Sequence, residues 1–244
     1  MGKTRAKWRG GQLAFYDGTT HETVLPMAPV VFYDDFLGSA LNTDYWTGIN
    51  TNDATVAIGG SKITGHIHGT GESEDAGVYM NDDKPFNLDK GPIFECRLAI
   101  HVAPTSLAEI MIGVQDDSYG TASNRILNAD EVTRYAAFGF YNTLGAGLVP
   151  AIRTDDNNAN SGIINSGFGA VVLDAYHIYR IDFTDVDNVL FYIDGAQVAA
   201  TTTFVMSAGS NVMVQPVVMA QKKTADTGLA DIYIDYVKVW QATR

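Results

Sequence analysis

Residues 177–195 read HIYRIDFTDVDNVLFYIDG, and this stretch decides the fold. Two segments rich in β-branched and aromatic residues, 177–183 and 189–193, flank a short polar connection. The second segment ends on Asp194-Gly195, a dipeptide that accepts the positive φ angles of a tight hairpin turn. The stretch therefore predicts antiparallel strands, joined in sequence and continued beyond residue 195.

The same strand signals recur on both sides of this stretch. Residues 93–102 alternate with period two, so that Cys96, Leu98, Ile100 and Val102 share one face while Glu95, Arg97, Ala99 and His101 share the other. Residues 109–115 repeat the alternation, with Ile110, Ile112 and Val114 as the apolar set. Further strands are expected over residues 134–141, 147–153, 197–203, 212–220 and 230–240.

Strands at this spacing, with hardly any helical periodicity, predict an all-β sandwich of two packed antiparallel sheets. The core between the sheets is expected to include Leu98, Ile100, Ile112, Val114, Phe191, Ile193, Ile234 and Val237.

Residues 1–30 have a different character from the rest of the chain. Lys3, Arg5, Lys7 and Arg9 place four cations in the first nine residues. Residues 12–16 and 19–25 predict a hairpin with its turn at Asp17-Gly18, and two prolines then interrupt any regular strand. We therefore predict an N-terminal arm and hairpin over residues 1–30, followed by the sandwich over residues 31–244.

Composition limits the class of protein. The chain has 244 residues, of which 46% are hydrophobic and 18% charged, as expected of a folded domain. Its net charge is −12, and because four of the 16 basic residues lie in the first nine, residues 10–244 carry −16. An acidic body disfavours nucleic acid as a partner. No apolar stretch is long enough to span a membrane, and no apolar signal-peptide core follows the basic start. Cys96 is the sole cysteine, so no intrachain disulfide can form. We therefore expect synthesis in a reducing cytosol.

Three stretches resemble the concanavalin A-like jelly rolls of legume lectins, laminin-G-type modules and laminarinase-type glycoside hydrolases. These are Tyr33-Asp34-Asp35-Phe36 with the following 41–46, the paired strands of 177–195, and the final strand 231–240. The resemblance implies a concanavalin A-like jelly-roll sandwich.

Laminarinase-type enzymes place their carboxylates in an E-x-D-x-E pattern on one strand, because alternate residues share a face and two acids about 5 Å apart can act as nucleophile and acid. The corresponding strand here reads Glu109-Ile110-Met111-Ile112-Gly113, so only Glu109 matches. We therefore expect no enzyme activity.

Other reactive residues have structural interpretations. The acids of residues 72–75 are expected to be solvated loop charges, and His66 and His68 have no evident further ligands for zinc. Asp235 matches an acid that holds calcium in some relatives, but no metal or cofactor is predicted. Cys96 is expected in the core.

The chain is also similar to a group of bacteriophage virion proteins that look like catalytically empty lectin-type sandwiches. The similarity lies in residues 7–17 and in the final strand, 234–240. It implies a virion structural protein, made in the host cytoplasm, that decorates the capsid and binds the major capsid protein, another virion protein or neighbouring copies. The expected partner-binding residues are Lys3, Arg5, Lys7, Trp8, Arg9, Phe15 and Tyr16.

Two alternatives remain open at this point. A carbohydrate-binding module would use the same fold and stack sugars on exposed aromatics, for which Tyr119, Tyr135 and Tyr141 are candidates. A diverged glycosidase or lyase is the third interpretation.

Overall fold

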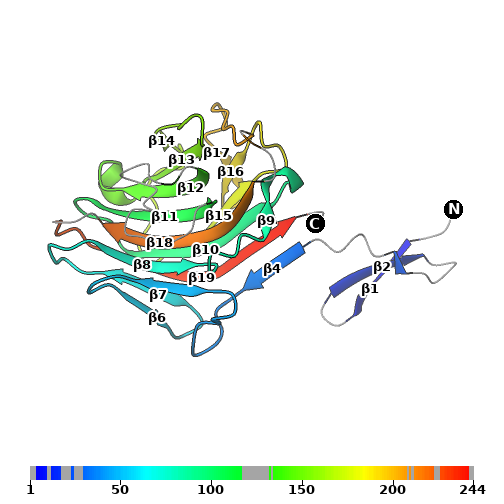
Figure 1. Ribbon diagram of the computed structural model, residues 1–244, viewed down its shortest axis with the longest axis horizontal. Helices are drawn as coiled ribbons and strands as arrows, with labels where there is room; N and C mark the ends of the chain where they lie inside the picture. Colours follow the sequence, from blue (N-terminus) through cyan, green and yellow to red (C-terminus); the bar gives the residue numbers. More distant parts are fainter. Residues whose placement is uncertain are drawn as a thin grey trace.

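Two antiparallel sheets of eight strands each form the body of the computed structural model, and a three-stranded sheet precedes them (Figure 1). The structure describes residues 4–9, 12–17, 23–24, 30–116, 132, 134–207, 209, 212–222 and 226–241, with side chains from Val31 onward. Within these ranges the only helical segments are the 3₁₀ turns η1 (Leu88–Lys90) and η2 (Gly145–Gly147), and no helix is long and apolar enough to cross a membrane. The predicted all-β sandwich is confirmed.

The first sheet is built around the C-terminal strand. In spatial order it contains β17 (Ala196–Val198), β16 (Leu190–Ile193), β15 (His177–Asp182), β10 (Ile93–Val102), β19 (Ala230–Gln241), β7 (Ile63–Ile67) and β6 (Thr55–Ile58), with β4 (Val30–Asp34) also paired to β19. The hairpin between β16 and β17 turns at Asp194 and Gly195, whose φ angles are 51° and 80°. The tight turn predicted from the sequence is therefore confirmed.

The second sheet has β11 and β18 at its centre. In spatial order it contains β14 (Ile164–Asn165), β13 (Pro150–Asp156), β12 (Arg134–Tyr141), β11 (Ala108–Gln115), β18 (Met213–Lys222), β8 (Glu74–Tyr79) and β5 (Thr47–Asn50), with β9 (Phe86–Asn87) also paired to β18.

The core between the two sheets holds all eight residues predicted for it, each of them buried. Aromatic rings join the sheets directly: the Phe138 ring of β12 meets Tyr179 of β15 and Phe191 of β16 edge-on, both at 5.3 Å between ring centroids. Edge-to-face contacts of this kind stabilise a core beyond the area that they bury. Cys96 is fully buried in this core, as predicted, and burial raises the pKa of its thiol.

The outer face of the second sheet is buried as well, which the sequence did not predict. A second apolar cluster lies there, and it includes Ile49, Met111, Val132, Tyr135, Ala137, Tyr141, Ala151, Val217 and Met219. All of β11, and all of β18 after Met213, is therefore buried on both faces.

The N-terminal segment forms its own small sheet from β1 (Thr4–Arg9), β2 (Gln12–Asp17) and β3 (Thr23–Val24). It is hydrogen-bonded into neither large sheet, and in Figure 1 it lies beyond the start of β4, apart from the sandwich. Phe15 and Tyr16 of β2 pair with Val24 and Thr23 of β3, so the tight turn expected at Asp17-Gly18 is wrong.

Replacing Ile112 with Ala tests the packing between the sheets. Ile112 is fully buried, so the substitution removes apolar contacts and leaves a cavity, and we expect the free energy of unfolding to fall by about 2–5 kcal/mol. Urea denaturation measures the change, with the exposed Val172→Ala as a control expected to shift stability by less than about 0.5 kcal/mol. A similarly small loss for Ile112→Ala would contradict the burial of this side chain in the core.

Candidate functional site

Strand β11 occupies the centre of the second sheet and points Glu109 toward its outer face. The strand register places Asp75, Gln221, Glu109 and Tyr141 in one row across four strands. Glu109 is only 5% exposed, and the Gln221 side-chain amide donates a hydrogen bond to its carboxylate at 3.4 Å. Burial, and next the Glu109 charge, raise the pKa of Tyr141 well above 10.0. Glu109 is thus embedded in a packed polar row.

The two positions that follow on this face of β11 carry no acid. Met111 belongs to the outer apolar cluster, and at Gly113 a Cβ atom would lie 2.2 Å from the Ala136 carbonyl oxygen. A carboxylate side chain therefore cannot stand at position 113 without a shift of the backbone. Asp75 lies two strands from Glu109, about 10 Å away at ordinary strand spacing, and is 2% exposed.

The tyrosines named as sugar-stacking candidates do not present an open platform. Tyr135 is fully buried and Tyr141 nearly so, both within the outer cluster, and Tyr119 lies outside the described residues. That expectation is wrong for Tyr135 and Tyr141, because the face toward which they point is covered.

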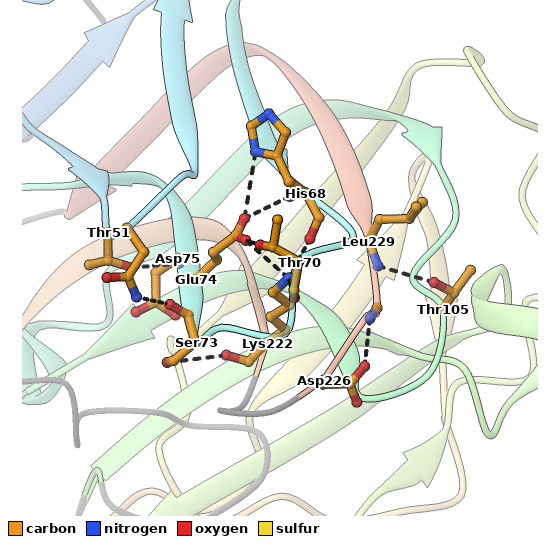
Figure 2. Close-up of polar contacts among 12 residues, drawn as sticks. Thr51, His68, Thr70, Ser73, Glu74, Asp75, Thr105, Lys222, Asp226 and Leu229 are labelled. Atoms are coloured by element: carbon orange, nitrogen blue, oxygen red, sulfur yellow. Dashed lines mark hydrogen bonds and ion pairs between the residues drawn. The ribbon is translucent and has the colours of Figure 1, made fainter.

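An ion pair is buried at one end of this sheet (Figure 2). Glu74 and Lys222 lie opposite one another on β8 and β18, 3.0 Å apart between Oε1 and Nζ, and both side chains are inaccessible to solvent. The expectation of solvated loop charges at residues 72–75 is therefore wrong for Glu74 and Asp75, both of which lie in β8 and are buried. Pairing with β18 makes this stretch a strand despite its charge.

Each member of the ion pair has further partners (Figure 2). Lys222 Nζ donates to the carbonyl oxygens of His68 and Thr70, and the Thr70 hydroxyl and His68 amide donate to the Glu74 carboxylate, the latter at 2.6 Å. Burial alone would raise the pKa of Glu74. Hydrogen bonds from Thr70, His68 and Lys222, together with the positive charge of Lys222, outweigh this effect of burial. The pKa of Glu74 therefore lies below its ordinary value.

The histidines and Asp235 form local pairs. His66 Nδ1 contacts the Asp231 carboxylate, and the His66 and His68 rings lie 4.2 Å apart between centroids. Asp235 accepts a hydrogen bond from the Arg97 guanidinium at 2.6 Å. Among the described residues no group of three or more His, Cys, Asp or Glu is placed to hold a metal ion.

Six of the seven predicted partner-binding residues lie in the small sheet. Arg5, Lys7, Trp8 and Arg9 lie in β1 and Phe15 and Tyr16 in β2, whereas Lys3 lies outside the described residues. The register pairs Trp8 with Leu13 and Ala6 with Phe15, while Arg5, Lys7 and Arg9 pair with Tyr16, Ala14 and Gln12. Arg5, Lys7 and Arg9 of β1 therefore alternate with Ala6 and Trp8.

An open groove of about 860 Å³ lies along β4, where the small sheet joins the body. Its walls come from β4, from residues 42–45 and from residues 80–86. Tyr33 and Tyr45 are 54% and 50% exposed in it, and the Phe32 ring packs edge-on against Tyr45 at 5.6 Å. The sequence did not predict this groove, because residues 80–86 meet residues 31–34 and 42–45 only in the folded chain.

Solved structures resemble this chain over most of its length, although neither a protein-family model nor a curated protein matches its sequence. The Emp47p carbohydrate recognition domain matches with a TM-score of 0.61 and 11% identity, covering 86% of this chain and 94% of that one. A β-1,3-glucanase from Mycobacterium marinum matches with a TM-score of 0.52 and 16% identity, covering 86% and 97%. The chain has the concanavalin A-like jelly-roll fold.

The concanavalin A-like fold predicted from the three sequence stretches is thus confirmed. A pseudo-β-1,3-glucanase of Mycobacterium tuberculosis also shares it, with a TM-score of 0.55 and 14% identity over 86% of this chain and 98% of that one. Recognition domains, glucanases and a pseudo-glucanase share this fold, so activity depends on the residues of each site.

Acid titration tests the Glu74–Lys222 pair. Because the folded-state pKa of Glu74 lies below its ordinary value of 4.5, its contribution to stability is present above that pH and is lost as the pH falls through the folded-state pKa. We expect Glu74→Gln to lose about 3–5 kcal/mol at neutral pH, since Lys222 is then buried unpaired, and the difference from wild type to shrink below pH 4.5. Chemical denaturation of wild type and variant at a series of pH values measures the loss at neutral pH and its decrease in acid.

Replacement of both partners is the matched control. Glu74→Leu combined with Lys222→Met removes both charges and should cost less than either single substitution. A double variant whose loss equals the sum of the single losses would contradict the pairing.

Proposed function

We propose that this protein is a non-catalytic structural protein of a virion, a capsid decoration protein that is made in the host cytoplasm and binds the shell and neighbouring copies. The observation that carries the proposal is the basic N-terminal segment, which forms a sheet of its own instead of extending the sandwich. The virion setting is supported by the sequence resemblance of residues 7–17 and 234–240. A separate β element with three cations on its edge strand suits attachment to an acidic surface.

The absence of catalysis is supported by the outer face of the second sheet. Retaining glycosidases need two carboxylates about 5 Å apart with access for water and sugar. Glu109 has Met111 and Gly113 as its neighbours on that face of β11, and the face is buried among the described residues. A diverged glycosidase is therefore a weaker candidate.

Glycan binding is the second candidate, and the groove along β4 is the observation that favours it. Exposed Tyr33 and Tyr45 lie in the groove beside Asn42 and Asp44, and aromatic rings next to polar side chains suit a sugar. The structural likeness to a carbohydrate recognition domain agrees with this candidate without assigning a ligand. Glycan-array binding that disappears in Tyr45→Ala would favour it over the virion proposal.

Hydrolysis assays test the lack of catalysis. Purified protein is expected to show no glycosidase or lyase turnover on β-glucans, agar, carrageenan or alginate, because the next two positions on the Glu109 face of β11 hold Met111 and Gly113 instead of a second acid. Reducing-end release is the measurement, with Glu109→Gln as the control variant. Turnover that is lost in Glu109→Gln would overturn the proposal.

Deletion of residues 1–29 tests the role of the N-terminal segment. The sandwich should remain folded, since β4 begins at Val30 and the small sheet pairs with neither large sheet. Attachment to undecorated particles should be lost, as measured by co-sedimentation, with circular dichroism to check the fold. Raising salt should weaken attachment of the full chain only in part, because screening removes the charge term and leaves aromatic burial. Equal attachment of both chains would identify the segment as an ordinary frayed terminus.

A further inference from the structure

We infer that the groove along β4 receives the basic strand β1 of a second copy of this chain, so that neighbouring copies join arm to groove. The inference rests on the proposed function and names the surface that the arm binds. It follows from three features of the described residues: an unpaired strand edge, a lining in which three acids face one cation, and an arm of opposite charge that is itself a strand.

The first feature is the free edge of β4. Within the described part of the chain β4 pairs with β19 alone, through residues 30–34 opposite 237–241, and its residues 31–34 line the groove. Val31 and Tyr33 are more than half exposed there. An exposed edge strand presents unpaired N–H and C=O groups that accept another strand.

The second feature is the charge of the groove. Asp34, Asp44 and Asp83 line it against the single cation Lys84. The Asp34 carboxylate accepts hydrogen bonds from the Phe36 amide at 2.9 Å and the Trp46 indole at 3.0 Å, which hold it in place without neutralising it. None of the three acids forms an ion pair with a described residue. The groove therefore attracts a cationic occupant.

The third feature is the arm itself. β1 is the edge strand of the small sheet, paired with β2 on one side only, and it carries Arg5, Lys7 and Arg9 at alternate positions. The described cations of the sandwich mostly have partners already, such as Arg97 with Asp235 and Lys222 with Glu74. The arm is thus the cation-rich strand that this chain offers to an acidic groove.

A second copy suits the groove better than the chain's own arm. The small sheet of the same chain lies beyond the start of β4 and away from the sandwich (Figure 1). Exchange of such a segment between identical chains needs no new fold, because each arm keeps its strands and gains a partner edge.

Charge reversal in the groove tests the inference on the full-length chain. Asp44 and Asp83 are exposed, so Asp44→Lys with Asp83→Lys should leave the fold intact while placing cations against the arm. We expect the dissociation constant for self-association, from sedimentation velocity at low salt, to rise about tenfold or more. The matched control carries Asp53→Lys and Asp187→Lys, which reverse the charge of two exposed acids outside the groove. It should change the dissociation constant little.

Compensation and cross-linking make the test specific. Adding Lys7→Glu and Arg9→Glu to the groove variant should restore association by exchanging the charges. An Ala6→Cys chain mixed with a Tyr45→Cys chain should give a heterodimer with a short bismaleimide, whereas mixing with Val172→Cys should not. Val172 is exposed and lies two residues before Asp174, whose backbone amide donates a hydrogen bond to the Ile100 carbonyl oxygen. Ile100 lies near the end of β10 that is far from β4, so Val172 is remote from the groove.

The outcomes separate the two proposals. A monomeric full-length chain, or a groove variant that associates like wild type, would overturn the arm-to-groove contact, and particle attachment that still requires residues 1–29 would leave the proposed function standing. Cross-linking only within a doubly substituted chain would show that the arm occupies its own groove. Glycan binding abolished by the groove variant, without any change in association, would assign the groove to a sugar.

Discussion

Burial of both faces of β11 and β18 is the constraint on which the rest of this structure depends. Ile112 fills the core between the sheets, while Met111 and Met219 are inaccessible on the opposite face. Polar groups on that outer face must then find partners within the protein, as Glu109 does with Gln221. Sugar binding or hydrolysis on this face would require access for water and ligand, and the buried outer residues of β11 and β18 do not provide it.

The same constraint explains the buried ion pair at the end of β8 and β18. Moving two charges out of water costs free energy, and their mutual attraction offsets this cost only when their other hydrogen-bonding groups also have partners. Glu74 and Lys222 find those partners in His68 and Thr70. The pair also fixes the register. A slip of β8 by one residue would turn Glu74 to the other face and leave Lys222 buried without a counter-charge.

The sequence predicts this fold where a strand has one apolar and one polar face, as β10 does, or where a turn has a distinctive dipeptide, as at Asp194-Gly195. It does not predict β8, because adjacent acids such as Glu74 and Asp75 are typical of loops and only the pairing with β18 makes them a buried strand. Tyr135 and Tyr141 were expected as exposed aromatics, but no local pattern shows that the face on which they lie is covered. The groove along β4 was likewise beyond prediction, since its walls come together only in the folded chain.

The net charge of the body and the short screening length together favour assembly through a small contact between oppositely charged groups. Two bodies that each carry −16 repel one another, so copies approach closely only where a cationic segment lies between them. At physiological ionic strength the screening length is about 8 Å, which weakens repulsion between whole bodies far more than attraction between groups in contact. An arm strand beside β4 would place its cations within a few ångströms of Asp44 and Asp83, where attraction survives screening. Backbone hydrogen bonds between the free edges of β1 and β4 would add an attraction that salt does not weaken. The strand pairing would then fix the register of the contact, and the charges would select the partner.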